Sequence, residues 1–177
     1  MAPARADRYD RRVRLLVFIV LAGCGITDFD ITQPVPEQRV QGSGIPNLPI
    51  DIFQIPLSLD LQAQIQKQTT GPIDSVTLHS LQLQITPHDH PAGDWSFVDE
   101  VHVFVKSSKD GSALPRVEIA HVMAPGKVTT MKFEVDDGVN LKPYVDEGSV
   151  VESEGKGTVP SNDVTYDGKG VFTVHPL

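Results

Sequence analysis

The sequence has little cysteine, no long apolar run and few basic residues. It holds one cysteine among 177 residues, which excludes an internal disulfide and therefore a disulfide-rich secreted scaffold. The longest apolar run covers only residues 15–22, well short of the roughly 20 residues that span a bilayer as a helix. With 15 Lys and Arg against 23 Asp and Glu, the net charge of −8 argues against nucleic-acid binding, which needs a basic face.

The sequence also lacks the motifs of the common enzyme classes. It contains no Gly-x-Ser-x-Gly elbow that would present a nucleophilic serine, and no glycine-rich phosphate-binding loop. We therefore predict a protein that is not an enzyme, with no catalytic residues, no metal site that can be assigned and no small-molecule cofactor.

The basic residues are concentrated at the N-terminus. Five of the fifteen are arginines within residues 1–23, where only two acids occur, so the other 154 residues carry a net charge of −11. A basic segment followed by a short apolar run and small residues is typical of a secretory signal peptide. We predict that residues 1–23 are such a signal and form no part of the folded domain.

The end of this segment contains the only cysteine. The sequence Leu21-Ala22-Gly23-Cys24 resembles the lipobox of bacterial lipoproteins. That resemblance implies cleavage before Cys24, lipid attachment to its sulfur (including palmitate-type acyl chains) and anchoring to a membrane. Gly25, rather than an aspartate, follows the cysteine. The resemblance therefore also implies the outer membrane of the cell envelope rather than the inner one. The alternatives are a free cysteine after an ordinary signal or a buried cysteine in an N-terminal helix.

Residues 24–50 and 51–177 differ in pattern. The first range, after the lipidated N-terminus, is rich in proline and is predicted to be a tether or a partly docked arm. The second has apolar residues alternating at period two over 55–66, 76–78, 81–85 and 101–105, with further strands at 117–123, 128–135, 149–159 and 164–174. A slip in phase at His79-Ser80 predicts a β-bulge.

This pattern predicts an all-β fold. About seven strands separated by frequent turns are typical of an antiparallel β-sandwich, with the immunoglobulin type among the architectures that fit. Residues 140–144 are predicted to form one short helical turn. The β-domain itself resembles no particular family.

One loop, from His88 to Trp95, contains the best candidates for a site. His88 and His90 point the same way in an extended chain, and Asp94 could add a carboxylate to a metal site. The third protein ligand would then have to be His79, His102 or His121. The competing interpretation is a solvated loop. An exposed Trp95 could instead stack on a sugar or contact a partner, although a tryptophan packed on the core is the commoner outcome.

Three hypotheses for function follow. The first is a membrane-anchored lipoprotein whose β-sandwich is a non-catalytic structural or protein-interaction module, bound to an unknown envelope partner. The second is a lipoprotein that binds a small ligand or glycan through the His88–Trp95 loop. The third and most remote is a metal-dependent hydrolase.

Overall fold

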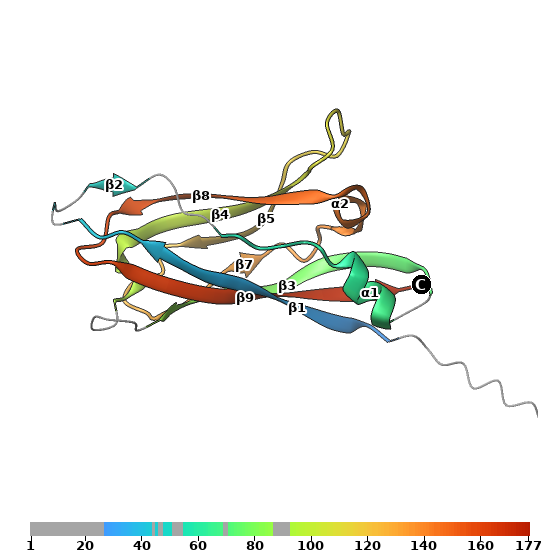
Figure 1. The fold of residues 1–177 in the computed structure, drawn as a ribbon, viewed down its shortest axis with the longest axis horizontal. Coiled ribbons are helices and arrows are strands. Elements are labelled where there is room, and N and C mark those ends of the chain that lie inside the picture. The colour runs from blue at the N-terminus through green and yellow to red at the C-terminus, as the bar shows by residue number, and fades with distance from the viewer. Residues whose placement is uncertain (1–26, 44, 46–47, 51–54, 69–70, 87–92) are drawn as a thin grey trace, which may run out of the picture.

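The computed structural model describes residues 27–43, 45, 48–50, 55–68, 71–86 and 93–177. These residues form two antiparallel sheets packed face to face (Figure 1), so the predicted all-β sandwich is confirmed. No helix within the described ranges is long and apolar enough to cross a membrane. The predicted signal segment and Cys24 lie outside the described residues.

Sheet A has four strands in the order β1-β9-β3-β6, and sheet B has five in the order β2-β8-β4-β5-β7. The strands of sheet A are β1 (Phe29–Val40), β9 (Val164–Pro176), β3 (Ile73–Thr86) and β6 (Thr130–Lys132). Those of sheet B are β2 (Pro49–Ile50), β8 (Ser149–Thr158), β4 (Val98–Ser107), β5 (Val117–Met123) and β7 (Glu134–Val135). An immunoglobulin domain places its last strand beside the preceding one. Here β9 instead lies between β1 and β3, so the sandwich has a different strand order.

The core lies between the sheets and is built mainly from the inward-facing half of each strand. In β3, the buried residues Val76 and Leu78 are followed by Leu81 and Leu83, which keeps all four side chains in the core despite the change of phase. The pairing of β3 with β9 shifts between Leu78 and Ser80. The predicted bulge at His79-Ser80 is therefore confirmed.

The predicted strand over 128–135 is two short strands. β6 pairs with β3 in sheet A, whereas β7 pairs with β5 in sheet B. Between them, the Phe133 backbone N–H donates to the Leu81 carbonyl oxygen (3.0 Å) and its side chain is buried. The chain thus crosses from one sheet to the other at Phe133, closing one side of the sandwich.

The prediction of a strand over 55–66 is wrong, because these residues pair with no other strand. The alternation of apolar residues did identify correctly which side chains of 55–61 are buried. Residues 55–61, here called the apolar strap, bury every second side chain but pair with no strand. The N–H groups of Leu57 and Leu61 donate to carbonyls two residues earlier, each at 2.7 Å, which kinks the backbone. Residues 62–68 form helix α1 (Gln62–Gln68), because Gln, Ala and Lys are good helix formers and Leu61 and Ile65 share one helical face.

The N-terminal region contributes a strand where an arm was expected. β1 pairs with β9 along the edge of sheet A, and Ile31 and Val35 are buried. An edge strand tolerates Pro34 and Pro36 because only one of its sides needs backbone donors. The register shifts between Val35 and Gln38, next to the second proline. The described domain therefore includes β1, well before residue 51.

Two short helices lie at the end of the sandwich where β1 begins and β9 ends (Figure 1). They are α1 and α2 (Lys142–Glu147), the second of which overlaps the predicted helical turn at residues 142–144 and continues three residues beyond it. The Leu141 N–H donates to the Val76 carbonyl oxygen (2.7 Å), and Asn140 Oδ1 accepts from the Val76 N–H (3.3 Å). These bonds fix the start of α2 against β3.

Candidate functional site

The loop considered as a candidate metal site is only partly described. His88 and His90 lie outside the described residues. Asp94 is an N-terminal cap: its Oδ1 accepts from the Ser96 N–H (3.0 Å) and from the Ser96 hydroxyl, at the start of the 3₁₀ turn η1 (Trp95–Phe97). These hydrogen bonds, the side-chain one first, lower the pKa of Asp94 by favouring the carboxylate. The residue thus has a local structural role.

Trp95 is buried and is not the exposed aromatic that a sugar-stacking site needs. Its side chain has no exposed surface (0%), and its indole Nε1–H donates to the Thr129 carbonyl oxygen (3.1 Å). Its ring lies 5.7 Å from that of Phe97 and 5.4 Å from that of Tyr166, the latter edge-on. Burial raises the pKa of the Tyr166 phenol. These rings pack together at the end of the core. Trp95 is therefore a core residue, which is the commoner outcome for a tryptophan.

The other candidate histidines lie on different sheets. His79 is exposed on β3 in sheet A. His102 of β4 and His121 of β5 are directly opposite each other in sheet B, with parallel rings 5.9 Å apart. The structure therefore brings together two of the three histidines that the sequence proposed as extra ligands.

Carboxylates flank the histidine pair on the outer face of sheet B. Glu118 Oε2 lies 3.0 Å from His102 Nδ1, and Glu118 Oε1 lies 3.1 Å from His121 Nδ1. Glu134 lies 3.4 Å from His121 Nε2. Glu118 and His121 are three residues apart but share a face because the strand pairing shifts between Val103 and Phe104, leaving Ile119 and Ala120 both buried.

This histidine cluster is a set of close contacts between imidazole nitrogens and carboxylate oxygens. Within the described part of the chain, no group of three or more His, Cys, Asp or Glu side chains is placed to hold a metal ion. Glu118 is directed at imidazole nitrogens that a metal would otherwise occupy. The cluster's side chains are about 30–39% exposed, except for Glu134 at 86%, so it is a solvated surface feature.

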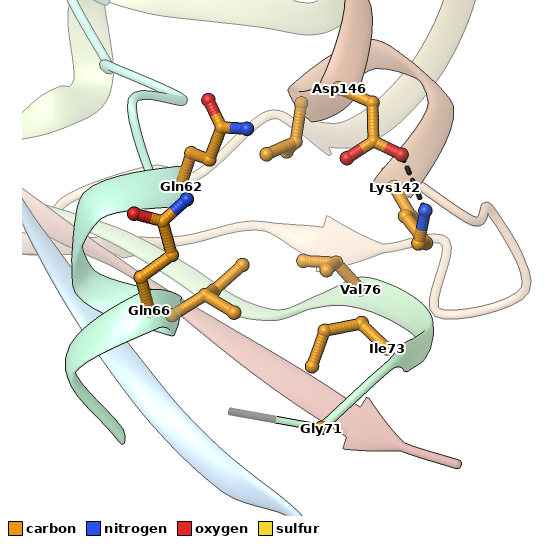
Figure 2. A pocket seen from close by; sticks show the side chains of 9 residues that line it. Gln62, Gln66, Gly71, Ile73, Val76, Lys142 and Asp146 are labelled. Carbon is orange, nitrogen blue, oxygen red and sulfur yellow. Dashed lines mark hydrogen bonds and ion pairs between the residues drawn. The ribbon is translucent and has the colours of Figure 1, made fainter. Parts of the chain in front are cut away.

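A pocket of about 390 Å³ lies between α1 and α2, at a place where no site was predicted. Figure 2 shows Gln62 and Gln66 of α1 facing Lys142 and Asp146 of α2, with Ile73 and Val76 of β3 between them. The lining is completed by Ile65, Gly71 and Val145. Its size falls within the range of about 300–1,000 Å³ that small-molecule sites occupy.

The rim of this pocket carries charges that compensate each other. Lys142 Nζ and Asp146 Oδ2 form an ion pair one helical turn apart, drawn as a dashed line in Figure 2. The side-chain amides of Gln62 and Gln66 make no hydrogen bond to any described residue. The pocket therefore offers an aliphatic floor and a neutral rim with free hydrogen-bonding groups.

The spacing of the rim residues was visible in the sequence, but their context was not. Gln62 and Gln66, like Lys142 and Asp146, are four residues apart, a separation that places side chains on one helical face. Because the alternation over 55–66 predicted a strand, Gln62 and Gln66 were expected on its solvent face. The pocket follows from α1 being a helix.

Comparisons with known proteins assign this chain to no family. No protein-family model matches the sequence, and no curated protein matches it. Among solved structures, a chain described as the crystal structure of the decameric BFDV capsid protein is similar with a TM-score of 0.41 and 13% sequence identity. The match covers 84% of this chain and 98% of that chain. At this level of similarity it places the protein in no family.

Proposed function

We propose that the protein is a cell-envelope lipoprotein, anchored to the outer membrane through lipid on Cys24, whose β-sandwich is a non-catalytic structural or interaction module. The observation that carries the proposal is the Leu21-Ala22-Gly23-Cys24 sequence at the end of a basic and then apolar leader. Two or more acyl chains bind a membrane stably, since each buried methylene contributes about 0.8 kcal/mol.

The position of the first strand supports this proposal. β1 begins at Phe29, and Ile31 is the first buried apolar residue among those described. Cys24 is five residues before Phe29, and a fully extended chain covers at most about 18 Å between their Cα atoms. In a lipidated protein, the sandwich would thus be held close to the membrane by the end that carries α1 and α2.

The opposite end of the sandwich has features of an interaction surface. Figure 1 places β2 at this end, away from the start of β1. Among the described residues, four of the six large exposed hydrophobic side chains are in the segments there: Ile45, Leu48, Met123 and Val128. Apolar side chains exposed at the rim of a domain are common anchors for protein partners. An envelope partner would bind this end, facing away from the membrane.

Metabolic labelling with a palmitate analogue tests the anchor. The wild-type chain is expected to incorporate the label and to sediment with membranes. The Cys24→Ala chain is expected to incorporate none, because it has no other cysteine. Immunoblotting both strains for total protein controls for expression. Equal labelling of the two chains would refute the lipoprotein assignment.

A small-ligand function is favoured at a different place from the one predicted. Because Trp95 is buried in the core, the His88–Trp95 loop does not offer it as a stacking surface for a sugar ring. The pocket between the two helices is one of several described pockets large enough for a small ligand, and its aliphatic floor suits an apolar one.

A further inference from the structure

We propose that the pocket between α1 and α2 binds a single aliphatic chain with a neutral, hydrogen-bonding head, of the monoacylglycerol type, taken from the adjoining membrane. The delivery of this ligand rests on the proposed lipid anchor. The chemistry of the pocket does not, so the two ideas can be tested separately.

The floor of the pocket selects an aliphatic partner. Ile65, Ile73, Val76 and Val145 supply branched aliphatic side chains, and none of the described lining residues is aromatic. Sugar rings and nucleobases are usually held by aromatic faces, which are absent from this lining. Val76 is fully buried and Ile65 is 9% exposed, so a chain that reached them would leave water.

The rim selects a neutral head. The Lys142 charge is compensated by Asp146 in the ion pair that Figure 2 shows, which leaves no free charge to attract a carboxylate or a phosphate. The two glutamine amides across the pocket supply donors and acceptors. Ester carbonyls and hydroxyls are the complementary groups.

The place of the pocket in the fold points to the membrane as the source. In sheet A, Phe29 pairs with Val174, which pairs with Val76 on its other side. The pocket residue Val76 therefore lies two strands from Phe29, a separation of about 10 Å. Since Cys24 is only five residues before Phe29, the lipid anchor and the pocket belong to the same end of the molecule.

The free energy of transfer from a bilayer favours a lipid with one chain over a lipid with two. Moving a chain from the bilayer into an aliphatic pocket exchanges one apolar environment for another, so little free energy is gained per methylene. A lipid with two chains would have to expose the second, at about 0.8 kcal/mol per methylene. A single-chain lipid avoids that loss, and its head adds hydrogen bonds to Gln62 and Gln66.

Titration of the full chain carrying Cys24→Ala with monooctanoylglycerol tests the proposal without a membrane. This variant has no lipid of its own to compete for the pocket. Isothermal titration calorimetry is expected to give a dissociation constant below about 1 mM, a value set by the number of ligand atoms. Methyl resonances of Ile73 and Val145 are expected to shift. Octanoate, with the same length of chain and a charged head, is expected to bind at least tenfold more weakly.

Two further variants of the same chain, with a matched control, locate the site. The double change Gln62→Leu and Gln66→Leu removes both amides from exposed positions and is expected to weaken binding about tenfold. Val145→Trp fills the cavity and is expected to abolish binding. Gln68→Leu, on the same helix but outside the pocket lining, is the matched control and should leave affinity within twofold. Melting temperatures establish whether each variant is folded. If Val145→Trp does not fold, the affinity of the double glutamine variant tests the location of the site.

The proposal is overturned by any of three results. These are no binding of monooctanoylglycerol, equal binding of octanoate, or unchanged affinity when both glutamines are replaced. None depends on acylation, so loss of palmitate labelling would leave the pocket intact, and loss of binding would leave the anchor intact.

Discussion

Trp95 shows how a single side chain decides between two functions for a loop. Its indole is fully buried against Phe97 and Tyr166, and its one polar atom is satisfied by the Thr129 carbonyl. A tryptophan held in this way fastens the segment before β4 to the core. It contributes to stability and is not available to a ligand.

Substitution of Trp95 should therefore lower stability strongly. Removing a large buried aromatic costs about 3–5 kcal/mol of unfolding free energy, from lost burial and the cavity that remains. We expect Trp95→Ala to lose an amount in that range in urea denaturation followed by circular dichroism. Met123→Ala, at a side chain that is 58% exposed, serves as the control and should change stability by less than about 0.5 kcal/mol. A small loss for Trp95→Ala would mean that the indole is on the surface.

Asp94 makes a second prediction at this scale, about pH. The Ser96 hydroxyl and N–H hold its pKa below the ordinary value of 3.8. Because the folded-state pKa is depressed, the stabilisation is present above the ordinary pKa and is lost as the pH falls through the lower, folded value. In an NMR titration, Ser96→Ala should raise the pKa of Asp94 towards 3.8, since it removes the larger of the two hydrogen bonds. An unchanged pKa would contradict this account of the cap.

At the scale of elements, the apolar strap tests whether alternation requires a strand. Leu61 is fully buried, and Ile55, Leu57 and Leu59 are 3–6% exposed, although the segment joins neither sheet. The Ile55 N–H donates to Ser153 Oγ of β8 in sheet B (3.0 Å). The strap is held mainly by its side chains rather than by a ladder of backbone hydrogen bonds.

Shortening a strap side chain should consequently cost as much as a core substitution in a strand. Leu61→Ala is expected to lower the unfolding free energy by about 2–5 kcal/mol. Ser58→Ala, on the exposed side of the same segment, should have an effect of less than about 0.5 kcal/mol. Denaturation curves of the two variants make the comparison. If both lost little, the strap would not be packed against the core in solution.

The strap also shows what the sequence could and could not predict. Period-two burial was read correctly, as was the slip at His79-Ser80, because both depend on which side chains face the core. The ends of strands were harder: the helix α1 has only Ile65 buried, so its own apolar pattern was too short to compete with the preceding alternation. β1 was missed because its two prolines are tolerated only at a sheet edge, a position that the local sequence does not reveal.

The candidate sites also divide into features that the local sequence reveals and features that only the tertiary structure creates. The sequence analysis named His102 and His121 as possible additional metal ligands. Only the strand register places them opposite each other, with Glu118 in contact with both. The pocket depends on two helices separated by more than 70 residues of chain, and no local pattern connects them.

At the scale of the whole molecule, the net charge and the proposed anchor belong to different parts of the chain. Residues 24–177 carry a net charge of −11, which would repel them from anionic lipid surfaces. Attachment would then depend on the lipid at Cys24 alone. The residue after the cysteine offers a way to move the protein between membranes without touching the described fold.

Gly25→Asp is the variant that makes this prediction. The lipobox resemblance implies that an aspartate after the lipidated cysteine favours retention in the inner membrane, whereas glycine permits transfer to the outer one. We expect the variant to move from mainly outer-membrane to mainly inner-membrane fractions on a sucrose density gradient. Gly25→Asn, similar in size and uncharged, is the matched control and should stay with the outer membrane. Because residue 25 precedes β1 by four positions, both variants should keep the wild-type melting temperature; a shared distribution of all three chains would show that sorting does not read this position.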